Sequence, residues 1–151
     1  MPLWTHKNIK AWIFLNDHCD PHVTFDCRAD HWTARIRFSM VKPDISLVDV
    51  KPKRNAPSVA LLNLLANQLD QRLERCRMVW WQTKGGELCI DNKEVMRIGS
   101  GRVLLDGPFA SGVIIAKSGN YLPGPHGNGY RVTVPSVRWT DGTVTNRELV
   151  E

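Results

Sequence analysis

Residues 57–83 read PSVALLNLLANQLDQRLERCRMVWWQT, and this stretch decides the predicted fold. After Pro57 it contains no further Gly or Pro, and its apolar residues recur at spacings of three and four, as they do in an amphipathic helix. The apolar stripe consists of Leu62, Leu65 or Ala66, Leu69, Leu73, Cys76 and Trp80. Asn55 or Ser58 is suited to cap the start, and Gly85-Gly86 is suited to end the helix. The stretch therefore predicts one long helix that must pack against another layer.

The residues before this helix predict the layer that it covers. Residues 9–15 and 22–28 are rich in aromatic and β-branched side chains, and a turn-forming stretch separates them. Residues 33–41 alternate apolar and polar side chains with the period of two that marks a half-buried strand, so Arg35 and Arg37 point the same way. Residues 45–50 form a fourth candidate strand. These patterns predict a four-stranded antiparallel sheet.

The pattern changes after Gly85-Gly86, where glycines become frequent and no helical period remains. Short strands are expected at residues 88–90, 94–98, 102–106, 112–117, 130–134, 137–140 and 143–146. Asp141-Gly142 predicts a tight hairpin turn, and the Gly- and Pro-rich residues 119–129 predict a loop. The predicted fold class is thus α+β, with a four-stranded antiparallel sheet covered by one long helix and then a small SH3-like β-barrel. The expected domains are residues 1–84 and 85–151.

The composition is that of an ordinary globular protein, with 151 residues that are 42% hydrophobic and 23% charged. No apolar run approaches the roughly 20 residues that cross a membrane, and the first residues contain no apolar signal core. The spacing of Cys19, Cys27, Cys76 and Cys89 fits no compact disulfide framework and no structural zinc motif. Free thiols, a cytoplasmic location and no membrane partner are therefore expected, although disulfides are the alternative.

The net charge of +5 is unevenly distributed. Residues 1–84 hold 13 Lys and Arg against 8 Asp and Glu, whereas residues 85–151 hold 7 of each. The whole excess of positive charge therefore lies in the first half, where an acidic partner is expected to bind.

A cluster of imidazole and carboxylate side chains lies between the first two predicted strands. Its members are Asp17, His18, Asp20 and His22. Histidine and carboxylate are ligands for zinc and other divalent metals, and a metal held here would activate a water for hydrolysis. The alternative is a plain turn, because Asn, Asp and Pro are common turn residues. No other cofactor is expected.

Basic side chains form a second candidate site, with tryptophan beside them. They are Arg35, Arg37, Lys51, Lys53, Arg54, Arg72 and Arg75, together with Trp81. If these side chains converge, they form a surface that binds phosphates and stacks on bases. The alternative is a solvated helix face on which arginines pair with Asp70 and Glu74.

Nucleophilic catalysis has little support in the sequence. Cys19 beside His18 is a conceivable thiolate nucleophile, but no nucleophile elbow, phosphate-binding loop or dinucleotide fingerprint is present. We therefore assign no catalytic residue.

The segment Asp17-His18-Cys19-Asp20-Pro21-His22, after a hydrophobic strand and before a helix that ends in Trp80-Trp81, resembles a family of small bacterial domains of unknown function. That family carries the motif Asn/Asp-His-x-Pro-Pro-His-hydrophobic-His and is often encoded beside toxin–antitoxin partners. The resemblance covers residues 8–82. This chain has Asp20 at the first proline of the motif and Thr24 at its last histidine.

Residues 87–151 resemble small barrels of the SH3, Tudor or KOW kind, through a Gly-rich first strand and the hairpin Trp139-Thr140-Asp141-Gly142. Such barrels bind peptides, nucleic acid or nothing at all.

Together these features predict a non-enzymatic binding or accessory protein of a bacterial mobile or toxin–antitoxin-type locus, which contacts nucleic acid or a protein partner. The alternative is a metal-dependent hydrolase or nuclease that uses the loop with His18 and His22. The sequence predicts no oligomeric state.

Overall fold

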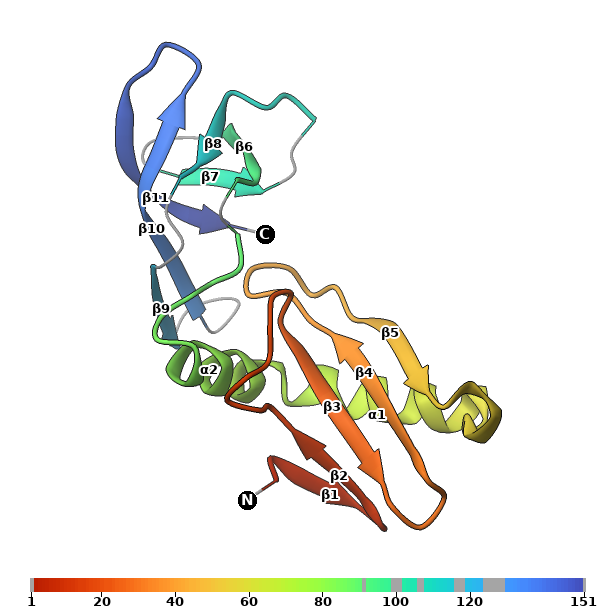
Figure 1. Ribbon diagram of the computed structural model, residues 1–151. Helices are drawn as coiled ribbons and strands as arrows, with labels where there is room; N and C mark the ends of the chain where they lie inside the picture. The colour runs from red at the N-terminus through yellow and green to blue at the C-terminus, as the bar shows by residue number, and fades with distance from the viewer. Residues whose placement is uncertain are drawn as a thin grey trace. The chain divides into compact units, whose positions relative to one another are not determined.

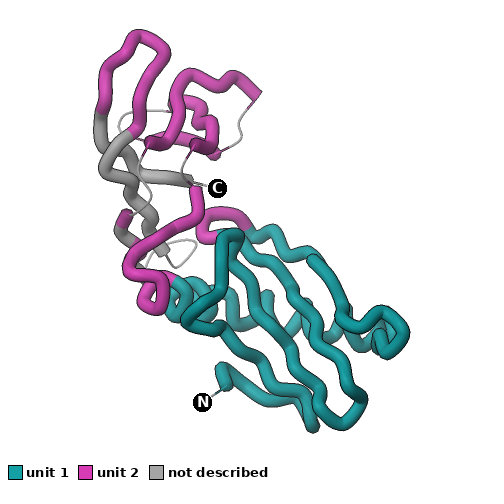
Figure 2. The backbone as a smooth tube through the Cα atoms, viewed as in Figure 1, with its two compact units in different colours: residues 1–39, 43–80 teal, residues 40–42, 81–151 magenta. Residues whose placement is uncertain are grey.

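The computed structural model describes residues 2–90, 92–98, 102–105, 108–115, 119–123 and 130–150. The chain divides into two compact units, shown in Figure 2. Unit 1 comprises residues 1–39 and 43–80, and unit 2 comprises residues 40–42 and 81–151. Within the described residues, every helix is too short or too polar to cross a membrane.

Unit 1 is built on a five-stranded antiparallel sheet in the order β1-β2-β3-β4-β5 (Figure 1). The strands are β1 (Trp4–His6), β2 (Ile9–Trp12), β3 (His22–Cys27), β4 (Trp32–Arg37) and β5 (Ser46–Lys51). Strand order follows chain order, so each strand pairs with the strand that precedes it along the chain. The pairing of β4 with β5 contains a bulge beside Arg35 and Ile36.

A short 3₁₀ helix, η1 (Lys53–Asn55), leads from the sheet to two helices, α1 (Val59–Gln71) and α2 (Leu73–Thr83). The Ser58 side chain caps α1 by accepting a hydrogen bond from the Leu61 backbone N–H at 3.1 Å. Gln68 joins α1 to the edge of the sheet, since its side chain lies 3.0 Å from both Trp4 Nε1 and His6 Nδ1. The helices therefore cover the sheet face that carries Trp4.

The core of unit 1 fills the layer between the helices and the sheet. Trp4 packs edge-on against Phe25, and Trp80 packs edge-on against Phe38. The side chains that alternate along β3 and β4 supply most of the apolar surface, and the helices contribute the rest. Buried members include Ile9, Ala11, Val23, Phe25, Trp32, Ala34, Ile36, Leu65, Leu69, Cys76 and Trp80.

Unit 2 contains a six-stranded sheet, and its strands β10 and β11 also pair directly with each other. Its strands are β6 (Glu94–Arg97), β7 (Arg102–Leu105), β8 (Gly112–Ile114), β9 (Asn120–Pro123), β10 (Tyr130–Trp139) and β11 (Val144–Val150). The pairing of β11 with β7 is parallel, and the other pairings are antiparallel. A Cβ atom at Gly112 would lie 2.8 Å from the Trp139 ring, so only glycine lets β8 approach β10 this closely.

The predicted fold class is wrong in several respects. The protein is mostly β, with a five-stranded sheet in place of four strands and with two helices in place of one long helix. The added strand, β1, is a three-residue edge strand whose sequence has no visible period. The helix breaks at Arg72, whose backbone leaves the helical conformation and whose guanidinium lies 5.1 Å from the centre of the Trp4 ring. In unit 2, residues 120–123 of the predicted loop form β9, and residues 124–129 lie outside the described residues.

Candidate ligand-binding pocket

A pocket of about 650 Å³ opens within unit 1, and we call it the loop pocket. It is lined by residues 16–20 and 46–48 together with His22, Arg35 and Arg37. Its volume is within the range of pockets that bind small molecules. The loop pocket brings together the whole predicted metal cluster and two of the predicted basic residues. Strand pairing explains this, because His22 of β3 lies opposite Arg37 of β4, and Arg37 lies opposite Ser46 of β5.

Hydrogen bonds hold the carboxylate and the imidazole of the loop in place. One oxygen of Asp17 accepts a hydrogen bond from the Phe14 backbone N–H at 2.7 Å. Its other oxygen lies 3.4 Å from His22 Nε2, and the opposite ring nitrogen, Nδ1, lies 2.8 Å from the carbonyl oxygen of Asp20. The side chains of His22 and Asp17 are only 10% and 12% exposed. The imidazole is therefore held by a hydrogen bond at Nδ1 and lies beside the Asp17 carboxylate at Nε2, while it still lines the pocket.

The two arginines of the pocket have different partners. Arg35 donates from two nitrogens to the carboxylate of Asp49 on β5. This bond holds the pKa of Asp49 below its ordinary value and raises the pKa of Arg35, because each charged form stabilises the other. Arg37 lies 3.6 Å from Asp20, and both side chains are about half exposed. The Arg35 side chain is thus held in place in the pocket lining by Asp49, whereas Arg37 forms only a weak, solvent-screened pair with Asp20.

The Arg35–Asp49 pair predicts how stability changes in acid. Near neutral pH, Asp49→Asn should lower the free energy of unfolding by about 1 kcal/mol or less, because the pair retains contact with solvent. The pKa of Asp49 in the folded protein lies below 3.8, so its contribution is present above that pH and is lost as the pH falls through the depressed pKa. Urea unfolding of both proteins should therefore show a difference that closes below pH 3.8. A difference that persists unchanged in acid would contradict the prediction.

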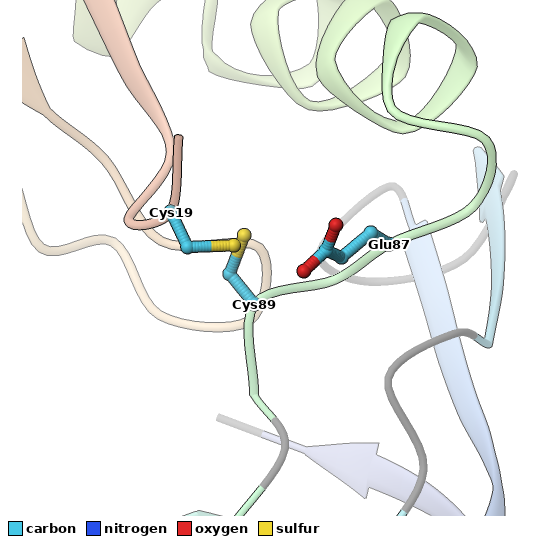
Figure 3. A group of neighbouring side chains, drawn as sticks. All are labelled: Cys19, Glu87 and Cys89. Carbon is cyan, nitrogen blue, oxygen red and sulfur yellow. The ribbon is translucent and has the colours of Figure 1, made fainter. Parts of the chain in front are cut away.

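Two of the four cysteines differ from the expectation of free thiols. Cys19 is in a disulfide, and so is Cys89, so neither residue is a free thiol; Figure 3 labels both residues and Glu87. Cys27 and Cys76 are free and buried, and burial raises the pKa of the Cys76 thiol to about 12. A disulfide sulfur is not a thiolate, so Cys19 is not a nucleophile in this state.

The metal hypothesis gains no support from the geometry. His18, His22, Asp17 and Asp20 all line the loop pocket. No three of these four residues, all of them described, bring their ligand atoms within 4.8 Å of one another. Zinc and similar ions need three or four ligands that converge on one point. The loop as it stands offers a divalent metal two neighbouring ligands at most, from Asp17 and His22.

The remaining predicted basic residues lie outside the pocket lining. Lys51 is 72% exposed and lies 3.8 Å from Asp49, while Lys53 and Arg54 are exposed on η1. Arg72 stacks on Trp4 and donates to the Gln68 carbonyl, and Arg75 is exposed on α2. Half-buried Trp81 donates its indole N–H to the Gly119 carbonyl at 3.0 Å. These residues therefore take separate positions on β5, η1 and the helices.

Sequence reasoning missed three features of the pocket region. Asp49 is the partner of Arg35, residues 46–48 line the pocket, and Phe14 stacks on Trp12 with ring centres 5.7 Å apart. Phe14 is 40% exposed. The available signal was the position of Phe14 at the end of an apolar run, two residues after Trp12, which places both rings on one side of an extended chain.

Comparison of the chain with protein-family models, with curated proteins and with solved structures finds no match. The resemblances to a bacterial domain family and to small barrels therefore remain predictions.

Proposed function

We propose that unit 1 binds single-stranded nucleic acid, with a phosphate at Arg37 in the loop pocket and a base stacked on Phe14. The observation that carries this proposal is a pocket lined by arginine and histidine side chains, with the backbone of the partly exposed Phe14 hydrogen-bonded to one of its lining residues. Arg37, His18 and His22 line the pocket, and the Asp17 carboxylate that borders it is bonded to the backbone of Phe14. Phosphate oxygens and base faces are the two parts of a nucleic acid that such side chains recognise.

The charges favour Arg37 as the phosphate ligand. Its pairing with Asp20 is long, and both groups are exposed, so an incoming phosphate displaces Asp20 at little cost. A guanidinium can donate two parallel N–H groups to a phosphate. A phosphate is therefore a better partner for Arg37 than the single Asp20 carboxylate oxygen that now lies 3.6 Å away. Arg35 remains bonded to Asp49, so this pair is neutral overall and Arg35 is not the phosphate ligand.

The aromatic pair favours a single strand over a duplex. Trp12 and Phe14 stack with an angle of 14° between their ring planes, so Phe14 presents a supported, partly exposed ring. Bases in a duplex are stacked on one another and are not available to such a ring, whereas bases in a single strand are.

The proposal keeps the binding function that the sequence predicts and chooses nucleic acid as the partner. The cytoplasmic location that the sequence predicts stays a prediction. The disulfide-bonded state of Cys19 and Cys89 counts against that location, because disulfides persist mainly in oxidising compartments.

Fluorescence anisotropy with labelled single-stranded DNA and RNA oligonucleotides tests the proposal. Phe14→Ala should lower the affinity by about 5- to 150-fold, which is the loss of one stacked base, about 1–3 kcal/mol. Arg37→Ala should weaken binding and reduce the log–log salt slope by about 0.7, the value for one phosphate contact on a single strand.

Matched controls are available at Leu15, next to Phe14, and at Arg28, just after β3. Leu15 is 82% exposed and follows Phe14, so Leu15→Ala removes apolar surface without removing a ring. Arg28 has a 91% exposed side chain outside the loop pocket and lies 3.7 Å from Asp26, a weak pair like that of Arg37 with Asp20, so Arg28→Ala is the matched loss of one charge. Equal losses in each variant and its control, or no binding at low salt, would refute the proposal.

A further inference from the structure

We propose that a bound single strand continues from the loop pocket along β2 to a second phosphate site at Lys10. This inference rests on the proposed function, because the strand must already be held at Arg37 and Phe14. It adds the surface over which the rest of the strand lies and the direction in which the strand runs.

The pairing of the strands divides the residues of the sheet between two faces. Directly opposite residues of antiparallel strands point to the same side of a sheet. One such row consists of Trp4, Ala11, Phe25, Ala34 and Val50. This row faces the helices, because Trp4 is hydrogen-bonded to Gln68 of α1, and Figure 1 shows the helices on one side of the sheet. The neighbouring residues along each strand point to the opposite side, which we call the outer face.

The outer face carries more basic than acidic side chains. Its rows are His22, Arg37 and Ser46, then Trp12, Thr24, Arg35 and Asp49, then Lys10, Asp26, Thr33 and Lys51. These rows contain four basic residues, two on β4 and one each on β2 and β5, against the two carboxylates of Asp26 and Asp49. The face is continuous with the loop pocket, because Arg35 and Arg37 line that pocket as well. A polyanion held in the loop pocket is therefore complementary to the outer face.

The aromatic side chains of β2 indicate the direction of the strand. Lys10, Trp12 and Phe14 are spaced two residues apart, so they lie on one side of the extended chain at intervals of about 7 Å. Trp12 stacks on Phe14 on one side and has Lys10 on the other. Trp12 is partly exposed, so the ring pair offers one stacking surface at Phe14 and a second at Trp12. Stacking on such rings accepts any base.

Lys10 is placed to bind a phosphate beyond this ring pair. Its row includes Thr33, which is four residues along β4 from Arg37, a length of about 13 Å. An extended single strand covers this length with a few nucleotides. Lys10 is exposed, and the opposite carboxylate, Asp26, lies 3.7 Å from Arg28. The ammonium group of Lys10 is therefore accessible to a phosphate.

Lys51 occupies the same row at the other side of the outer face, and it is the alternative end point. Its ammonium group lies 3.8 Å from the carboxylate of Asp49. The strand that carries it, β5, has the sequence SLVDVK and contains no aromatic residue. A path over β5 therefore offers a charge without a stacking surface, which favours the path along β2.

The test compares these two lysines in the full chain. Fluorescence anisotropy with a labelled ten-nucleotide oligothymidylate, measured over a range of salt concentrations, gives the log–log salt slope of each variant. Lys10→Gln should reduce the slope by about 0.7, the value for one phosphate contact on a single strand. Lys51→Gln removes the same charge from the same row and should leave the slope unchanged.

Two further measurements separate a lost contact from a lost fold. Lys10→Arg keeps the positive charge and should retain the slope of the unchanged protein. Lys10→Gln alters an exposed residue, so its urea unfolding transition should coincide with that of the unchanged protein.

The outcomes separate this inference from the proposed function. A slope that falls in Lys51→Gln and not in Lys10→Gln would direct the strand over β5, which overturns the inference and leaves binding in place. Equal reductions in both variants, or a reduction in neither, would also overturn it, because the charge at Lys10 would then have no special part in binding. Failure of the unchanged protein to bind the oligonucleotide at low salt would refute both proposals.

Discussion

Replacing Trp80 with alanine is expected to lower the free energy of unfolding by about 3–5 kcal/mol, the cost of deleting a large aromatic side chain from a core. Trp80 has no exposed surface. Its ring packs edge-on against Phe38 with centres 6.2 Å apart, and it also contacts the ring of His22. The substitution therefore leaves a cavity between helix and sheet, and the surrounding side chains cannot fill it by small movements.

Guanidinium unfolding followed by circular dichroism measures this loss. Trp80→Phe is the matched variant, because it keeps a ring against Phe38 and leaves a smaller cavity, so it should cost less than half as much. A loss below about 1 kcal/mol for Trp80→Ala, the size typical of an average substitution, would show that Trp80 is not a central part of the core.

The same residue links the fold to the loop pocket. Because Trp80 contacts the imidazole, Trp80→Phe should loosen His22 as well as destabilise unit 1. The contact joins a residue of the helix stripe to a residue of the candidate site, although 58 positions separate them in the sequence. No pattern within one sequence reports such a contact.

Local periodicity accounts for the features that could be predicted. The alternation along β4 correctly placed Arg35 and Arg37 on one side of the strand, and both line the loop pocket. The spacing of three and four along residues 57–83 identified Leu65, Leu69, Cys76 and Trp80, all of which are buried. These signals are strong because one face of each element is apolar over several periods.

The errors arise where nonlocal contacts override local pattern. The chain leaves the helix at Arg72 without any Gly or Pro, where the side chain stacks on Trp4 from the other end of the unit. Strand β9 forms in a Gly- and Pro-rich stretch because it pairs with β10. The loop pocket likewise exists because β3, β4 and β5 pair in one register, and the register follows from the assembled sheet.

The second large effect is expected from a substitution on the buried face of α1. Comparing a buried with an exposed leucine of this helix separates the contribution of packing from that of helix propensity. Leu69 has no exposed surface, whereas Leu64 is 39% exposed. Leu69→Ala should lower the free energy of unfolding by about 2–5 kcal/mol, because it removes buried surface and leaves a cavity.

Leu64→Ala is the control, and its cost should stay within about 0.5 kcal/mol, because alanine favours helix slightly more than leucine and little surface is lost. Both variants have the same helix composition, so any difference between them measures packing against the sheet and not helix propensity. Equal losses in urea unfolding would mean that α1 does not bury its Leu65–Leu69 stripe in solution. A large loss confined to Leu69→Ala would mean that tertiary packing of one face, more than the intrinsic stability of the helix, holds α1 on the sheet.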